Sequence, residues 1–175
     1  YEDTRDAESC IRLIKESCQY TVAGNHDLNA VKKTPQHTEG FDFPDDWYAL
    51  SPEKKKELGA GKVWLYDNEE LPVEISDDHT DFLKNLPEYD SFQSGRFQIF
   101  ISHYTFPDLT GMRSKFTNTV GGVTRHLNFI KQHHAMIGFT GHDHPDGWIF
   151  GTKTNCRERD FGLFELDCRY QWISL

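Results

Sequence analysis

The sequence predicts an α/β fold, and two of its patterns lead to this prediction. Short apolar runs with strand character alternate with segments whose apolar residues recur at helical spacing. Polar residues, several of them histidines, directly follow three of the predicted strands. In parallel α/β sheets, functional groups gather at the carboxyl ends of the strands. The same patterns therefore predict the fold class and the place of a functional site.

The composition is that of a globular domain. The chain has 175 residues, of which 37% are hydrophobic and 14% aromatic, enough for one domain with its own core. The formal net charge of −9 disfavours a nucleic-acid backbone as a partner, since such binding relies on clustered Lys and Arg. No apolar run could span a bilayer and no secretory signal opens the chain, so we expect a cytoplasmic protein without membrane contact.

The first elements are predicted to be a helix, a strand and a loop. The helix has Asp3 or Thr4 as its candidate cap. The run QYTVAG (19–24) is predicted to be a short strand that leads into the loop GNHD (24–27). Apolar residues at helical spacing mark the inner face of the helix: Ala7, Cys10, Ile11, Ile14 and Cys18. We interpret the cysteines as reduced, partly buried thiols.

The middle of the chain, at about residues 32–94, is interpreted as a helical and irregular insertion that covers one side of the core. Ser51 is the predicted cap of a short helix that stops at Gly59, and a second helix begins at Ser76 and ends before Pro87. The aromatic residues of the insertion could stack on a nucleobase, but we favour packing on the core. They are Phe41, Phe43, Trp47, Tyr48, Trp64 and Tyr66.

The second half returns to the α/β pattern. RFQIFISH (96–103) and AMIGFTG (135–141) are predicted strands, and the helix between them begins near residue 122. The tail alternates apolar and polar residues in WIFGT, DFGLFELD and YQWISL, which predicts closing strands. One stripe of the predicted helix consists of Val123, Leu127, Ile130 and His134.

Metal-ligating residue types follow the three predicted strands. Residues 25–27 follow the first, His103 the second, and His142 and His144 the third. Imidazole is the commonest metal ligand at neutral pH, and amide or carboxylate oxygen can complete such a site. Side chains two apart in an extended segment point to one side, so His142 and His144 can face one cavity, while Asp143 points away and is structural. The remaining histidines are expected to be solvated or half-buried: His37, His79, His126, His133 and His134.

Three motifs carry a family resemblance. GNHD, a strand-ending SH and GHDH, in place of the commoner GHTH, resemble the calcineurin-like metallophosphoesterase superfamily in order and spacing. The match runs from Tyr20 to Pro145, and the chain is similar to the small bacterial and archaeal phosphoesterases. The resemblance implies a single domain over residues 1–175, built of layered β-sheets flanked by helices, with the insertion as the region that selects the substrate.

The resemblance also implies the metal ligands. Asn25, His103 and His142 match ligands of the second metal of the family, and His144 matches a ligand of the first. Two divalent ions are implied for the complete site, and Mn, Fe, Zn or Ni would suit mixed imidazole, amide and carboxylate ligands. A hydroxide held between two such ions would attack phosphorus in a phosphomonoester or phosphodiester.

Further residues match or suit roles at the substrate. His26 matches the histidine that assists at the leaving oxygen, and Asp27 matches the carboxylate that orients it. Arg113, Lys115 and Arg125 are candidates for contact with a phosphate. The implied partner is a small phosphorylated substrate.

The family pattern begins with DxH and GD motifs, and neither occurs between Tyr1 and Gly24. We expect that the N-terminal strands of the domain are absent from the chain and that the natural protein extends upstream. Strands supplied by another chain and a degenerate relative are the alternatives. Since only His144 matches the first metal, at most one weak metal site is expected. The alternative function is a non-catalytic scaffold with this fold.

Overall fold

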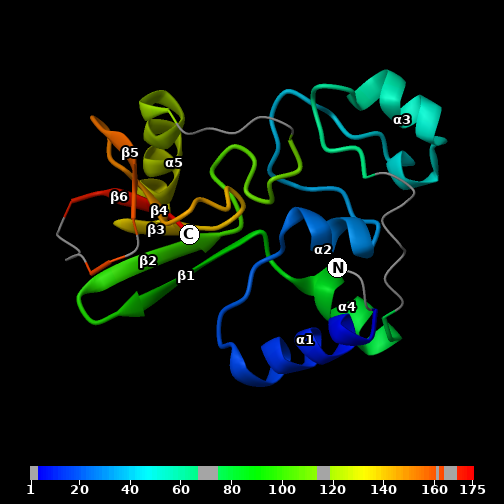
Figure 1. Cartoon of the computed structure of the whole chain (residues 1–175), viewed down its shortest axis with the longest axis horizontal. Coiled ribbons are helices and arrows are strands. Elements are labelled where there is room, and N and C mark those ends of the chain that lie inside the picture. Colours follow the sequence, from blue (N-terminus) through cyan, green and yellow to red (C-terminus); the bar gives the residue numbers. More distant parts are fainter. Residues whose placement is uncertain (1–3, 67–74, 114–118, 161, 164–168) are drawn as a thin grey trace.

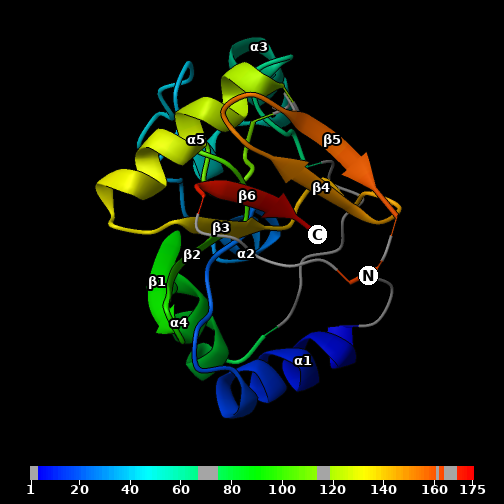
Figure 2. The ribbon, with the colours of Figure 1, turned by 90° about the vertical axis from the view of Figure 1, so that its left-hand side faces the viewer.

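The computed structural model describes residues 4–66, 75–113, 119–160, 162–163 and 169–175. Figures 1 and 2 show helix α5 on one side of a β-sheet and helices α1 and α4 on the other. In the described ranges, no helix is both long and apolar enough to cross a membrane. The six strands are β1 (Tyr89–Ser94), β2 (Phe97–Ser102), β3 (Ile137–Thr140), β4 (Trp148–Gly151), β5 (Cys156–Arg159) and β6 (Gln171–Ser174).

The sheet is mixed, with the strand order β1-β2-β3-β6-β4-β5. Its centre is parallel, since β3 pairs in parallel with both β2 and β6. The two edges are antiparallel, through β1 with β2 and through β4 with β5 and β6. Helix α5 (Val120–Gln132) connects β2 to β3, which makes a βαβ unit. The predicted α/β class is thereby confirmed, with one sheet in the described chain.

The predicted stripe of α5 packs on the sheet. The Thr119 hydroxyl caps the helix by accepting a hydrogen bond from the Gly122 N–H at 3.2 Å. Val123, Leu127 and Ile130 are fully buried, with Phe100, Ile149 and Trp172 in the same cluster. The prediction is wrong for its fourth residue, His134. This residue lies beyond the end of the helix, has a φ of 60° and is exposed.

His126 is buried, contrary to the expectation of a solvated or half-buried ring. It lies on the inner face of α5 and is 0% exposed. Its Nδ1 accepts a hydrogen bond from the Phe106 N–H at 3.0 Å, and its Nε2 lies 3.0 Å from where a Cβ on Gly138 of β3 would stand. Burial lowers the pKa of His126 to about 3. Helical spacing places this residue between the inward positions 123 and 130, a signal that the sequence did contain.

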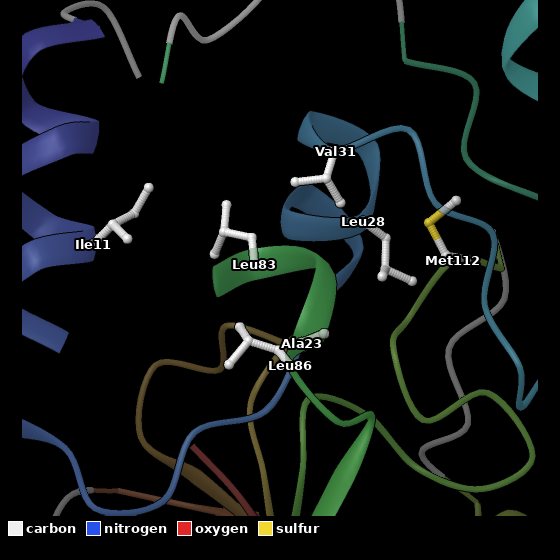
Figure 3. Packing of buried hydrophobic residues seen from close by; sticks show 7 residues of the cluster. All are labelled: Ile11, Ala23, Leu28, Val31, Leu83, Leu86 and Met112. Carbon is white, nitrogen blue, oxygen red and sulfur yellow. The ribbon is translucent and has the colours of Figure 1, made fainter. Parts of the chain in front are cut away.

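A second core contains residues of three helices and of neighbouring segments, apart from the core beneath α5. The helices are α1 (Thr4–Ser17), α2 (Asn25–Ala30) and α4 (Asp77–Asn85). Figure 3 shows the buried side chains that they share with neighbouring segments: Ile11, Ala23, Leu28, Val31, Leu83, Leu86 and Met112. The predicted inner face of α1 is only partly correct. Ile11 is buried, whereas Cys10, Ile14 and Cys18 are exposed.

The cysteines in the described chain are free thiols. Cys10 and Cys18 are exposed, which corrects the expectation of partial burial, and Cys156 is half-buried as expected. Cys168 lies outside the described residues.

The predicted strand at residues 19–24 is wrong. The segment is not part of the sheet, although the Ala23 N–H donates to the Pro87 carbonyl at 2.8 Å. Pro87 itself has no N–H with which to return a backbone hydrogen bond to Ala23. The predicted loop at residues 25–27 is instead the first turn of α2.

The insertion contains its predicted helices but is shorter than expected. The Ser51 hydroxyl caps α3 (Pro52–Gly59), and the Ser76 hydroxyl caps α4. Phe41 and Trp47 are buried in a small aromatic core, as expected from packing, whereas Trp64 is exposed, contrary to that expectation. The predicted boundary at residue 94 is wrong, because strand β1 at residues 89–94 pairs with β2 and belongs to the sheet.

Candidate metal centre

The loops that follow β2 and β3 meet the start of α2. His103 comes directly after β2, His142 comes two residues after β3, and Asn25 is the first residue of α2. Because β2 and β3 are parallel neighbours, their carboxyl ends lie at one edge of the sheet. The Gly141 N–H donates to the His103 carbonyl at 3.0 Å, which joins the two loops.

Three potential ligand atoms come close together at this edge. The Nε2 atom of His103 lies 2.9 Å from Oδ1 of Asn25 and 3.2 Å from Nδ1 of His142. Ligands bound about 2.1 Å from one ion stand about 3.0 Å apart in octahedral and about 3.4 Å apart in tetrahedral coordination. Both distances match the spacing of ligands that share one divalent cation, and all three atoms have suitable donor chemistry.

The electrostatic environment keeps both imidazoles neutral. Burial, together with the neighbouring charges of His142, His26 and His144, lowers the pKa of His103 to about 3. Burial, with the charges of His144 and His26, lowers the pKa of His142 to about 4. Only neutral imidazole has a lone pair for a metal ion, so these shifts favour cation binding at neutral pH.

Two glycines make room for the imidazole rings. A Cβ on Gly24 would lie 3.0 Å from the ring of His103. A Cβ on Gly111 would lie 2.6 Å from both Cε1 and Nδ1 of His142, and Gly111 also has a φ of +72°. Any larger residue would push the rings from these positions. The sequence motif includes Gly24, whereas nothing in the sequence pointed to Gly111.

Tyr66 joins the centre from the insertion. Its Oη accepts a hydrogen bond from Nδ2 of Asn25 at 2.8 Å, and its ring makes an edge contact with His26 at a centroid distance of 5.5 Å. Tyr66 was expected to pack on the core with the other aromatics of the insertion. Its contact with Asn25 spans 41 positions of sequence and had no local signal.

The loop after β3 differs from the expected extended segment. His142 and His144 have φ values of 73° and 46°, so the alternation of a strand does not apply to them. His144 is exposed, although its charge contributes to the pKa of the two half-buried imidazoles, His103 and His142. The Asp143 carboxylate accepts a hydrogen bond from the Ser174 hydroxyl at 2.9 Å, which fits the structural role expected of it.

The two predicted catalytic residues lie in the first turn of α2. His26 is exposed and contacts the Tyr66 ring. The Asp27 carboxylate accepts a hydrogen bond from the Gly24 N–H at 2.8 Å, and burial raises the pKa of Asp27. Asp27 thus stabilises the start of α2, and its predicted action on His26 stays a prediction.

The candidate substrate arginines have different surroundings. Arg125 is exposed and forms an ion pair with Glu39, which balances its charge. The backbone N–H of Arg113 donates a hydrogen bond to the Asp108 carboxylate at 2.8 Å. Burial raises the pKa of Asp108 to about 6. Lys115 lies outside the described residues.

In the part of the chain that the structure describes, no three His, Cys, Asp or Glu side chains gather closely enough to hold a metal ion. The candidate centre consists instead of two imidazoles and one amide. The expectation of at most one weak site, in place of the two ions of the family, stays a prediction.

Comparisons with known proteins identify no family. No family model matches the sequence, and no curated protein matches it. A solved structure of a hypothetical protein from Pyrococcus horikoshii OT3 is similar, with a TM-score of 0.49 and 10% sequence identity. The match covers 81% of this chain and 51% of that one, so the chain spans about half the length of this neighbour. So remote a likeness carries no argument about function.

Proposed function

We propose that the protein is a divalent-metal-dependent phosphoesterase that hydrolyses a phosphomonoester or a phosphodiester. The observation that carries the proposal is the spacing of 2.9 and 3.2 Å between Nε2 of His103 and the donor atoms of Asn25 and His142. The three motifs that supply these residues resemble the metallophosphoesterase superfamily, which suggests the reaction. The layered sheets of that superfamily and its second metal ion belong to the same proposal.

Asn25, His103 and His142 would hold one cation through an amide oxygen and two neutral imidazole nitrogens. A bound divalent cation supplies a water of lowered pKa and neutralises charge on phosphoryl oxygens. Mn, Fe, Zn and Ni all accept this mixed set of ligands. His144 would contribute one further imidazole, which alone would hold a second ion poorly.

His26 is the residue best suited to move a proton. Its ring is accessible to solvent, and its charge lies near enough to lower the pKa of both His103 and His142. A ring nitrogen of His26 would donate a proton to the departing oxygen of the ester. Asp27, the next residue of the same helical turn, would orient the ring, as the resemblance implies.

A depression that is lined in part by Pro145, the residue after His144, could take the organic part of a substrate. It has a volume of about 860 Å³. The arginines and aromatics of β4 and β5 line it, together with acidic residues, so it suits no single charge class. Its principal lining residues are Trp148, Phe150, Arg157, Glu158, Arg159 and Asp160.

A non-catalytic scaffold is the second candidate. The observation that favours it is that only His144 is available for the first metal among the matched residues. A scaffold would retain the fold, and even one bound ion, without turning over phosphate esters.

Hydrolysis of p-nitrophenyl phosphate and of its bis ester tests the proposal. The full chain, His103→Ala and Asn25→Ala would be assayed with Mn²⁺ and with a chelator, and Mn²⁺ binding would be measured by calorimetry. The control is His134→Ala, since His134 is exposed beyond the end of α5.

We expect turnover that needs Mn²⁺ and falls at least about 100-fold in both ligand variants but not in the control. Mn²⁺ binding without turnover of either ester would favour the scaffold. If the unmodified chain shows no Mn²⁺ binding and no turnover of either ester, the phosphoesterase proposal is wrong.

A further inference from the structure

A chain of polar contacts runs from the insertion into the candidate metal centre. The Tyr66 Oη contacts Sδ of Met112 at 3.9 Å and Nδ2 of Asn25 at 2.8 Å. Oδ1 of the same Asn25 amide lies 2.9 Å from Nε2 of His103. Asn25 is buried, at 5% exposed, so these partners govern how its amide is oriented.

The orientation of the amide decides whether Asn25 can be a ligand. An amide group has an oxygen that can bind a cation and a nitrogen that cannot, and a half turn exchanges the two. The Met112 sulfur accepts hydrogen bonds but has no hydrogen to give, so it takes the phenolic proton of Tyr66. The Tyr66 Oη then offers a lone pair, which attracts the amide nitrogen and turns the oxygen toward His103.

Packing holds both ends of this chain in place. Met112 is 0% exposed and belongs to the same buried cluster as Leu28 of α2. Figure 3 shows Met112 on a loop opposite α2, the helix that begins with Asn25. A sulfur fixed in a packed core can direct a hydroxyl proton, whereas a mobile surface group could not.

We propose that Tyr66 is a positioning residue of the metal centre, which turns the Asn25 amide so that its oxygen faces the cation. This inference rests on the proposed function, because it assumes that Asn25 is a ligand. It assigns the insertion a part in building the centre, in addition to covering the core. Removal of a partner that orients a ligand in this way typically weakens metal binding by about 10- to 100-fold.

The test compares Mn²⁺ affinity in variants of the full chain by calorimetry. Tyr66→Phe removes the hydroxyl and keeps the ring. The matched control is Tyr48→Phe, since Tyr48 is a half-buried tyrosine of the insertion whose Oη donates to the Lys33 carbonyl at 3.1 Å. We expect Tyr66→Phe to bind Mn²⁺ at least about tenfold more weakly, with a thermal midpoint no lower than that of the control.

A second background separates orientation from general packing. Asn25→Asp replaces the amide with a carboxylate, whose two oxygens are equivalent, so no wrong orientation exists. In the Asn25→Asp background, Tyr66→Phe should change Mn²⁺ affinity by less than about twofold. In the chain with Asn25, the same substitution should weaken binding at least about tenfold. An equal loss in both backgrounds would overturn the inference and leave a structural role for the ring.

The outcomes distinguish the two proposals. If the unmodified chain binds Mn²⁺ and Tyr66→Phe binds it equally well, the proposed positioning role of Tyr66 is wrong, but the proposed metal centre is supported. If the unmodified chain does not bind Mn²⁺, the metal centre fails and the role of Tyr66 fails with it.

Discussion

Two glycines set how closely the backbone approaches the imidazoles of the centre. Gly24 lies against the ring of His103, and Gly111 lies against the ring of His142. Gly111 also has a left-handed φ of +72°, which a side chain would disfavour. A methyl group at Gly111 would therefore add backbone strain and displace a potential ligand.

Replacing Gly111 should separate these two effects when a matched glycine is replaced as well. Gly61 has a φ of +69° and open space around its Cβ position, so Gly61→Ala adds strain alone. We expect each variant to lose about 1 kcal/mol of unfolding free energy because of backbone strain. Gly111→Ala should lose more stability and bind Mn²⁺ more weakly, because its methyl group would also displace the His142 ring. Urea unfolding and Mn²⁺ titration would measure these effects. Identical behaviour of both variants would contradict the close contact with His142.

At the scale of the element, α5 joins the sheet through a buried histidine. The His126 ring is fully enclosed, and the Phe106 N–H occupies its Nδ1. Its pKa of about 3 in the folded chain lies below the ordinary value of 6.5. As the pH falls below 6.5, the unfolded chain takes up a proton at this ring and the folded chain does not. His126 therefore lowers stability progressively between pH 6.5 and pH 3.

His126→Asn should make stability less sensitive to acid. The Asn amide oxygen can accept from the Phe106 N–H in place of Nδ1 and does not titrate. Between pH 7 and pH 5 we expect the variant to lose about 2 kcal/mol less stability than the unmodified chain. Urea unfolding at both pH values measures this difference, in which the contributions of other titrating groups cancel. Parallel pH profiles would show that the ring is not kept neutral.

At the scale of the molecule, the centre lies where the α/β half meets the helical half. Figure 1 shows α2 facing the ends of β2 and β3, with α3 farther away in the insertion. Strand β3 is paired on both sides and lies under α5, whereas α3 is mostly exposed. Local stability should therefore be highest in β3 and lowest in α3.

Amide hydrogen exchange can test this distribution. We expect the slowest exchange in residues 137–140 and fast exchange in residues 52–59. Addition of Mn²⁺ should slow exchange in residues 24–28 and 103–112, because a bound ion stabilises the loops that hold it. Mass spectrometry of peptides with and without Mn²⁺ provides the measurement. Protection that increased in α3 instead would contradict the placement of the centre.

Local patterns in the sequence predicted the α/β class, three residues of the inner stripe of α5, the caps at Ser51 and Ser76, and the grouping of Asn25, His103 and His142. These features depend on helical spacing, cap chemistry or a short motif, all of which lie within a few positions of one another. The sequence also contained the signal for His126, which its spacing from Val123 would have revealed.

Only the tertiary structure decided the sheet order, the status of residues 19–24 and the contact between Tyr66 and Asn25. Each depends on which distant segment becomes a neighbour: Pro87 cannot return a backbone hydrogen bond to Ala23, and Tyr66 reaches Asn25 across 41 positions. The same holds for Gly111, which is needed only because the ring of His142 packs against it. Contacts of this kind arise from the packing of the whole chain, so no local pattern of residues contains them.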